Sequence, residues 1–189
     1  MSNYVLIARS PLGRPPHDFD GVTIAEVAGR AIVSVSVPAQ GENALSRAFA
    51  DTYKIAVPSV GKSSVSEVGE ARLLGLQRDQ MFLLFDGLDS DPVRQVASRL
   101  GNSAYLTDQS DSWAMIEASG SKLLAAMERL CPVDLDDHVF PIDGVIRTVM
   151  EHLAVIIIRK TSDSFLLLSP RSSTMSFLHM LETAVGDVS

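Results

Sequence analysis

The chain of 189 residues is poor in cysteine, aromatic residues and long apolar runs. Its one cysteine, Cys131, cannot form an intramolecular disulfide, and this scarcity is typical of proteins from a reducing compartment. The longest purely apolar run, Leu153 to Ile158, has six residues, whereas a helix that crosses a bilayer needs about 20. The first residues lack the basic start and long apolar stretch of a secretory signal peptide. We therefore expect a cytoplasmic protein that has no membrane partner.

Basic residues are also scarce. The chain has 16 Lys and Arg against 23 Asp and Glu, which gives a net charge of −7. A general nucleic-acid binder needs a basic face, so we expect no nucleic-acid partner. With 46% hydrophobic and 21% charged residues, the composition is that of a globular protein. The length suits one domain or two closely fused halves.

Residues 1–21 are expected to form an extended N-terminal arm. Pro11, Pro15 and Pro16 exclude a regular helix there and favour extended chain. A segment of this composition is held in place only by contacts with something else. Two possibilities are open: another subunit, or the surface of the chain's own domain.

Residues 22–189 are expected to form a single α+β domain built of two halves, about 22–101 and 102–189. The elements expected in the first half are strands at 22–27 and 31–37, a helix at 42–53, a loop at 56–69, strands at 71–77 and 80–85, and a helix at 92–100. The boundaries of the last helix are the clearest. Asp91 suits the N-cap, Pro92 the first helical position and Gly101 the position after the end.

The second half repeats this order of structure without repeating the residues. Its expected elements are strands at 103–107 and 113–118 joined by a turn, a helix capped by Ser119 or Ser121, strands at 145–151, 153–159 and 165–168, and a final helix that begins at Ser169-Pro170. The hairpin-length connections predict mostly antiparallel sheets with helices on one face.

Three expected strands, at 81–85, 153–158 and 165–168, do not alternate apolar and polar residues. An antiparallel strand with one wet face should alternate, so these strands are expected to be covered on both faces. Helices would cover one face. The other half of the chain, or a partner, would cover the second, and we favour an intramolecular core.

One short pattern resembles a phosphate-binding loop. Gly61-Lys62-Ser63 has Ala56 where that motif needs a glycine, and Pro58 with the surrounding serines predicts a loop rather than a strand followed by a helix. We interpret the pattern as a chance occurrence.

Thiol and imidazole groups also fail to form a site. Cys131 ends a predicted helix, where the helix dipole disfavours a thiolate, so we interpret it as buried and inert even though His138 and His152 follow it in the sequence. The histidines lack the spacing of metal ligands; they are His17, His138, His152 and His179.

Carboxylates give no clearer signal. Asp134, Asp136 and Asp137 lack the spaced ligands and the glycine of a calcium loop and suit a solvated turn. Three more lie at strand ends, where turn chemistry explains them more simply than acid–base catalysis: Asp108, Asp111 and Glu117. We expect no catalytic, cofactor-binding or metal-binding residue in this chain.

The residues do suggest a family. Residues 107–120 (TDQSDSWAMIEASG) and 128–141 (ERLCPVDLDDHVFP), with the apolar strands that follow and the Ser-Pro-Arg segment, resemble the gamma subunit of heterotetrameric sarcosine oxidase. The resemblance extends back through residues 21–38 and 72–85 and covers about residues 20–185.

The most specific part of the resemblance is a short segment after the third expected helix. It comprises Cys131-Pro132, Asp134-Leu135 and Phe140-Pro141. Asp111-Ser112 and Trp113 depart from the family, whose members often carry smaller or basic residues there.

The resemblance implies a fold like the folate-binding domain of glycine-cleavage aminomethyltransferases. It also implies a heterotetramer in which larger alpha and beta chains, with a delta chain, hold FAD, FMN, NAD and tetrahydrofolate. The complex oxidises an N-methyl amine and passes the carbon to folate or releases formaldehyde. This chain would be its non-catalytic gamma-type subunit, packed mainly against the alpha chain.

Three alternatives remain beside that reading, and one of them is a scaffold that assembles with copies of itself. Closely similar chains serve complexes of the N-methylglutamate dehydrogenase type, so the resemblance does not select the substrate. A folate-binding transferase that works alone is the rival from another class. As the surface that contacts the alpha chain we expect the arm and the exposed part of the final helix, represented by Leu12, Arg14, Phe19, Arg171 and His179.

Overall fold

The computed structural model describes residues 10–67, 71–87 and 91–188. In chain order the elements are β1 (His17–Phe19), β2 (Val22–Glu26), β3 (Arg30–Ser36), α1 (Glu42–Thr52), β4 (Ser63–Val65), β5 (Ala71–Gly75), β6 (Gln80–Asp86), α2 (Pro92–Leu100), η1 (Gly101–Ser103), β7 (Tyr105–Asp108), β8 (Trp113–Ser119), α3 (Leu123–Leu130), β9 (Val145–Met150), β10 (Leu153–Arg159), β11 (Ser164–Pro170), η2 (Arg171–Ser173) and α4 (Thr174–Gly186).

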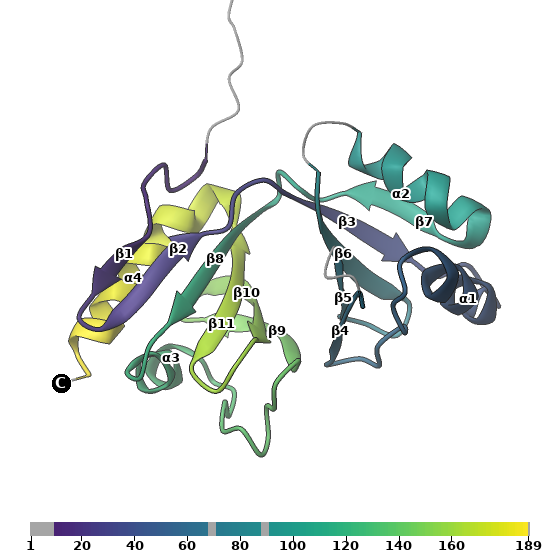
Figure 1. The fold of residues 1–189 in the computed structure, drawn as a ribbon. Coiled ribbons are helices and arrows are strands. Elements are labelled where there is room, and N and C mark those ends of the chain that lie inside the picture. The colour runs from purple at the N-terminus through teal and green to yellow at the C-terminus, as the bar shows by residue number, and fades with distance from the viewer. Residues whose placement is uncertain (1–9, 68–70, 88–90, 189) are drawn as a thin grey trace, which may run out of the picture.

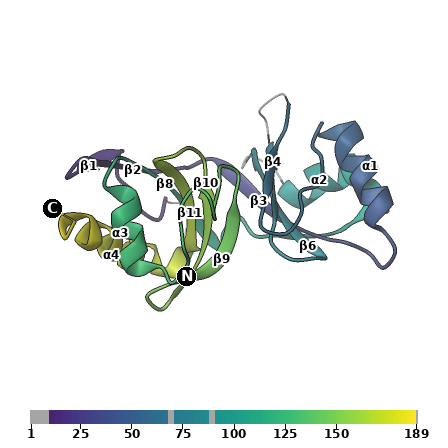
Figure 2. The same cartoon turned by 90° about the horizontal axis from the view of Figure 1, so that it is seen from below.

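The strands form two sheets. Sheet A has the order β1-β2-β8-β11-β10-β9, and sheet B has the order β4-β5-β6-β3-β7. Every pairing between these named strands is antiparallel. The two sheets face each other, α3 and α4 cover the outside of sheet A, and α1 and α2 cover the outside of sheet B (Figures 1 and 2). The expected α+β class with antiparallel sheets is confirmed.

The four layers enclose three apolar cores. One lies between sheet A and its helices and another between sheet B and its helices. The third lies between the sheets, where Phe82 and Leu84 of β6 meet Ile156, Leu166 and their neighbours from sheet A. Alternate residues of β6, β10 and β11 therefore face helices on one side and the opposite sheet on the other. The expectation that these strands are covered on both faces by the chain itself is confirmed.

The two halves of the chain exchange strands. The order β2-β3-α1-β4-β5-β6-α2 recurs as β7-β8-α3-β9-β10-β11-α4. In space, β2 pairs with β8 in sheet A, and β7 pairs with β3 in sheet B. Each half thus supplies the first of these strands to the sheet of the other half, and the halves 22–101 and 102–189 are not separate bodies. Residues 109–112, expected to join two paired strands, instead cross from one sheet to the other (Figure 1).

The last part of the extended arm expected at residues 1–21 forms a strand on the chain's own domain. Residues 17–19 form β1, which pairs with β2 through a hairpin in which Phe19 is opposite Val22. Asp20 and Gly21 both have positive φ, 51° and 80°, as a two-residue type I′ turn requires. The Asp18 carboxylate accepts a hydrogen bond from the Gly21 N–H at 3.0 Å. Asp-Gly is a strong hairpin signal, and it converts the end of the arm into an edge strand.

Helix boundaries were predicted unevenly. The Asp91 carboxylate caps α2 as expected, accepting from the Arg94 N–H at 3.0 Å, and Pro92 is its first residue. Ser169-Pro170 does not open the last helix, however. Ser169 is fully buried and pairs with Ala114 in the sheet, so β11 runs to Pro170 and α4 begins only at Thr174.

Two smaller expectations also failed. The loop expected at 56–69 contains β4, whose three residues pair with β5. Helix α3 begins after Lys122 and has no side-chain cap from either expected serine. Of the described helices, none has the length and apolar character needed to cross a membrane.

Candidate interaction surface

Helix α4 lies on the outside of sheet A with one face buried and the other open. Phe177, Leu178 and Leu181 are buried in the core beneath it. On the open face, the apolar side chain of Met175 is 57% exposed. This face is the first candidate for contact with another molecule.

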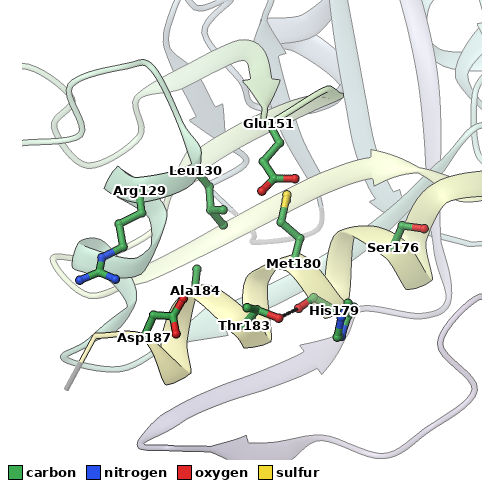
Figure 3. Close-up of a pocket in the computed structure, with 9 residues that line it drawn as sticks. All are labelled: Arg129, Leu130, Glu151, Ser176, His179, Met180, Thr183, Ala184 and Asp187. Atoms are coloured by element: carbon green, nitrogen blue, oxygen red, sulfur yellow. Dashed lines mark hydrogen bonds between the residues drawn. The ribbon is translucent and has the colours of Figure 1, made fainter.

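A groove of about 500 Å³ runs beside α4. Its lining comes from α4, the end of α3 and the turn between β9 and β10, as Figure 3 shows. Leu130, Met180 and Ala184 supply apolar surface, while charged groups and two hydroxyl groups line the remainder. The lining charged or titratable residues are Arg129, Glu151, His179 and Asp187.

The β9–β10 turn is fixed against α3. Glu151 has a positive φ of 52°, and its N–H donates to the Leu130 carbonyl at 2.9 Å. This bond satisfies one of the carbonyls that the end of a helix leaves free. The hydrogen bond ties the turn to the end of α3 on this side of the groove.

Two hydroxyl groups also line the groove. The Thr183 hydroxyl donates to the His179 carbonyl in its own helix at 2.8 Å (Figure 3). Ser176 is exposed on the same helix, and among the described lining residues no base is hydrogen-bonded to either hydroxyl. An apolar floor with a charged border can instead hold a side chain of another protein.

The N-terminal segment is attached to α4 through Glu182. The carboxylate accepts from the Arg14 guanidinium and lies 2.8 Å from His17 Nε2. Partial burial alone would raise the pKa of Glu182, but the hydrogen bonds from His17 and Arg14 outweigh burial and lower it below the ordinary glutamate value. Arg14, predicted as an interface residue, thus has an intramolecular partner and remains partly exposed.

Leu12 and Phe19 lie on the same side of the molecule as α4. Leu12 is partly buried against the core of sheet A, and its N–H donates to Glu26 Oε2 at 3.1 Å. Phe19 is 36% exposed and lies beside Gly186 at the end of α4. Within the part of the chain that the structure describes, the arm therefore packs on its own domain.

Arg171 stands apart from the other predicted interface residues. It lies at the start of η2, where its N–H continues the sheet by donating to the Ser112 carbonyl at 3.0 Å. Its guanidinium is 3.8 Å from the exposed Asp111 carboxylate. The structure gathers Arg14, Phe19 and His179 around α4 and puts Arg171 at the crossing between the sheets.

The Gly61-Lys62-Ser63 segment has no phosphate-loop geometry. Its three N–H groups donate to the carbonyls of Gly75, Ser59 and Asp143, at 2.9, 3.1 and 2.7 Å. Ser63 begins β4 rather than a helix. The backbone amides are therefore occupied by the fold itself.

The other reactive types also occupy structural positions. Cys131 is buried at the end of α3. Asp136, Asp137 and His138 are close enough to share a cation, but all three are exposed. The Asp134 and Asp136 carboxylates accept N–H groups two residues ahead, at 2.9 Å each, as turn residues do.

The sequence prediction missed most of the groove. Leu130, Glu151 and Met180 come from three separate segments, so no local pattern joins them. Met175 lies outside the groove lining, and the burial of Thr174, Phe177 and Leu178 puts it on the outer face of α4.

No model of a known protein family and no curated protein sequence matches the chain. Among solved structures, a chain of heterotetrameric sarcosine oxidase from Corynebacterium sp. U-96, in complex with pyrrole 2-carboxylate, is similar with a TM-score of 0.79 and 22% identity. The match covers 96% of this chain and 96% of that one. The two chains share one fold.

A second match is the glycine cleavage system aminomethyltransferase T from Bartonella henselae. Its TM-score is 0.61 at 12% identity, and the match covers 85% of this chain but 45% of that one. The fold expected from the resemblance, that of sarcosine oxidase and aminomethyltransferase chains, is therefore confirmed. The match to the sarcosine oxidase chain covers 96% of this chain, so the shared fold accounts for almost the whole protein.

Proposed function

We propose that this chain is a non-catalytic, gamma-type subunit of a heterotetrameric oxidoreductase that demethylates an N-methyl amino acid. Larger alpha and beta subunits and a delta subunit would complete the complex and hold FAD, FMN, NAD and tetrahydrofolate. The alpha-type subunit would be the main contact of this chain, in the cytoplasm.

The observation that carries the proposal is the end-to-end likeness to a chain of a heterotetrameric sarcosine oxidase, over 96% of both chains. The character of the α4 surface supports it, since a groove with apolar and charged borders suits a protein partner better than a reaction. Fold alone does not decide function, so the subunit role needs a direct test.

The test is purification of the tagged full chain from its own cells, followed by native mass spectrometry and an absorption spectrum. We expect larger chains to copurify and to carry the absorption bands of flavin. Activity of that complex with sarcosine or with N-methylglutamate then identifies the substrate and separates the two complex types. A colourless chain without partners would contradict the proposal.

The same purification tests the α4 surface. Met175→Glu introduces a charge on the exposed face of the first turn of α4 and should reduce copurification of the larger chains about tenfold or more, as expected for a buried interface position. Ala44→Glu is the matched control, because Ala44 is exposed in the first turn of α1 on the opposite outer layer. Equal recovery of partners by both variants would mean that the interface does not include the open face of α4.

A stand-alone folate-binding protein is the second candidate, favoured by the fold shared with an aminomethyltransferase over 85% of this chain. Calorimetric titration of the isolated chain with tetrahydrofolate separates the candidates. Tight binding by a chain that has no partners would support the second candidate. Lack of binding at millimolar ligand would remove it.

A further inference from the structure

A charged cleft of about 180 Å³ lies between the two sheets. Arg30 and Arg72 line it from sheet B, Glu117 from β8 of sheet A, and Lys160 from the residue that follows β10. Leu84 and Leu166, which belong to the core between the sheets, supply apolar walls. We call this the intersheet cleft.

The cations stand where the strand pattern calls for apolar core residues. Arg72 is two residues before Leu74, and Arg30 is two residues before Ile32, so both point into the layer between the sheets. Two leucines in these positions would extend the core. Cations there are costly to dehydrate unless an anion compensates them.

The carboxylates nearby compensate these cations incompletely. Arg30 contacts Asp86 through Nε at 3.1 Å, but Asp86 is 72% exposed, and ion pairs of that kind contribute little. Arg72 uses only Nη1, which donates to Ser63 Oγ and Asp143 Oδ1 at 2.7 Å each. Among the described residues, the other N–H groups of these two guanidiniums have no hydrogen-bond acceptor.

Lys160 is the third cation and pairs with the one carboxylate in the lining. Its Nζ donates to Glu117 Oε1 at 2.6 Å. The lining itself carries three positive charges and one negative charge, and the Asp86 and Asp143 carboxylates that pair with Arg30 and Arg72 lie outside it. The net charge of the whole chain is −7. Such a local excess in a cleft with apolar walls attracts anions and strengthens their hydrogen bonds.

We propose that the intersheet cleft binds a small dianion, a dicarboxylate or a phosphate group, between Arg30 and Arg72. Guanidinium groups form paired hydrogen bonds with both kinds of anion. The volume is below the roughly 300 Å³ at which pockets for larger ligands begin, which limits the ligand to a compact anion. The site goes beyond the proposed function, since it belongs to this chain alone.

The test is a calorimetric titration of the isolated full chain with glutarate and, separately, with inorganic phosphate, at constant ionic strength. We expect saturable binding at one site for at least one probe, and the better probe identifies the anionic group. Arg30→Gln should weaken binding about tenfold or more, as loss of a charge-assisted pair does. Arg94→Gln, an exposed arginine on α2, is the matched control and should bind as the parent does.

Two further variants separate loss of anion binding from loss of folding. Glu117→Gln removes the one lining carboxylate and should tighten binding, which a merely structural role would not produce. Arg72→Lys keeps the charge if Arg72→Gln fails to fold, and should weaken binding less than Arg30→Gln. Absence of saturable binding, or equal losses in the Arg30 and Arg94 variants, overturns the site. Neither result bears on whether the chain enters a heterotetramer, since the titration needs no partner.

Discussion

Phe82 and Trp113 meet edge to face between the two sheets, with ring centroids 6.2 Å apart and planes at 67°. Phe82 belongs to β6 of sheet B, and Trp113 begins β8 of sheet A. The contact thus joins the two sheets beside the crossing at residues 109–112. Trp113 is a packing residue here.

This contact predicts a measurable coupling. Phe82→Leu and Trp113→Leu should each destabilise the protein, and together by less than the sum of the two, with a coupling energy of about 0.5–1.5 kcal/mol. Urea unfolding of the two single variants and the double variant measures it. Strict additivity would mean that the rings contribute only their buried area.

Substitution of Gly120 is expected to destabilise the protein more than loss of the ring contact does. Gly120 has φ +145°, and a Cβ at this position would lie 2.4 Å from the carbonyl oxygen of Gly21. Gly120→Ala should therefore destabilise by about 3 kcal/mol or more, because backbone on both sides must move. Gly101→Ala is the control: its Cβ meets nothing within 4 Å, so it should cost less, through the strain of its backbone conformation alone (φ +57°, ψ −134°). Thermal or urea unfolding ranks the two.

Glu182 predicts a dependence of stability on pH. Its pKa is lowered in the folded chain through His17 and Arg14, so its contribution is fully present above the usual glutamate pKa and is lost as pH falls through the folded pKa. Glu182→Gln should reduce the unfolding free energy by about 1 kcal/mol or less at neutral pH. The difference from the parent should shrink below about pH 4. Glu128→Gln, on the exposed side of α3, should show no such trend.

The burial of Cys131 predicts slow modification of its thiol in the native chain. Only 7% of it is exposed, at the end of α3, so a disulfide reagent should react with the native chain far more slowly than with the chain in urea. The assay counts one thiol per chain after unfolding. Rapid, complete modification of the native chain would contradict the interpretation of Cys131 as a packing residue.

Short sequence patterns predicted helices and strands well where the residue type occurs in only one structural context. Asp91 and Pro92 mark the start of α2 and Gly101 marks its end, because helix capping depends on a few adjacent residues. Ser169-Pro170 was wrongly predicted to start the last helix, for a related reason. Proline also suits the end of a strand, and only the pairing of β11 with β8 decides between the two uses.

Placement in space was beyond the sequence pattern. A strand signal at residues 22–27 or 103–107 predicts a strand, and it does not say which sheet accepts that strand. The same limit hid the groove and the intersheet cleft. Arg30, Arg72 and Lys160 are spread over 130 residues of chain, and only the facing of two sheets brings them together.

The exchange of β2 and β7 also bears on how such a chain could arise. A protein made of residues 22–101 alone would leave one edge of β3 open and would carry β2 without its neighbour β8. Two copies of an ancestral half could satisfy these edges only by trading their first strands, as a swapped dimer does. Joining the copies in one gene makes the trade intramolecular, so that the completed sheets no longer depend on protein concentration.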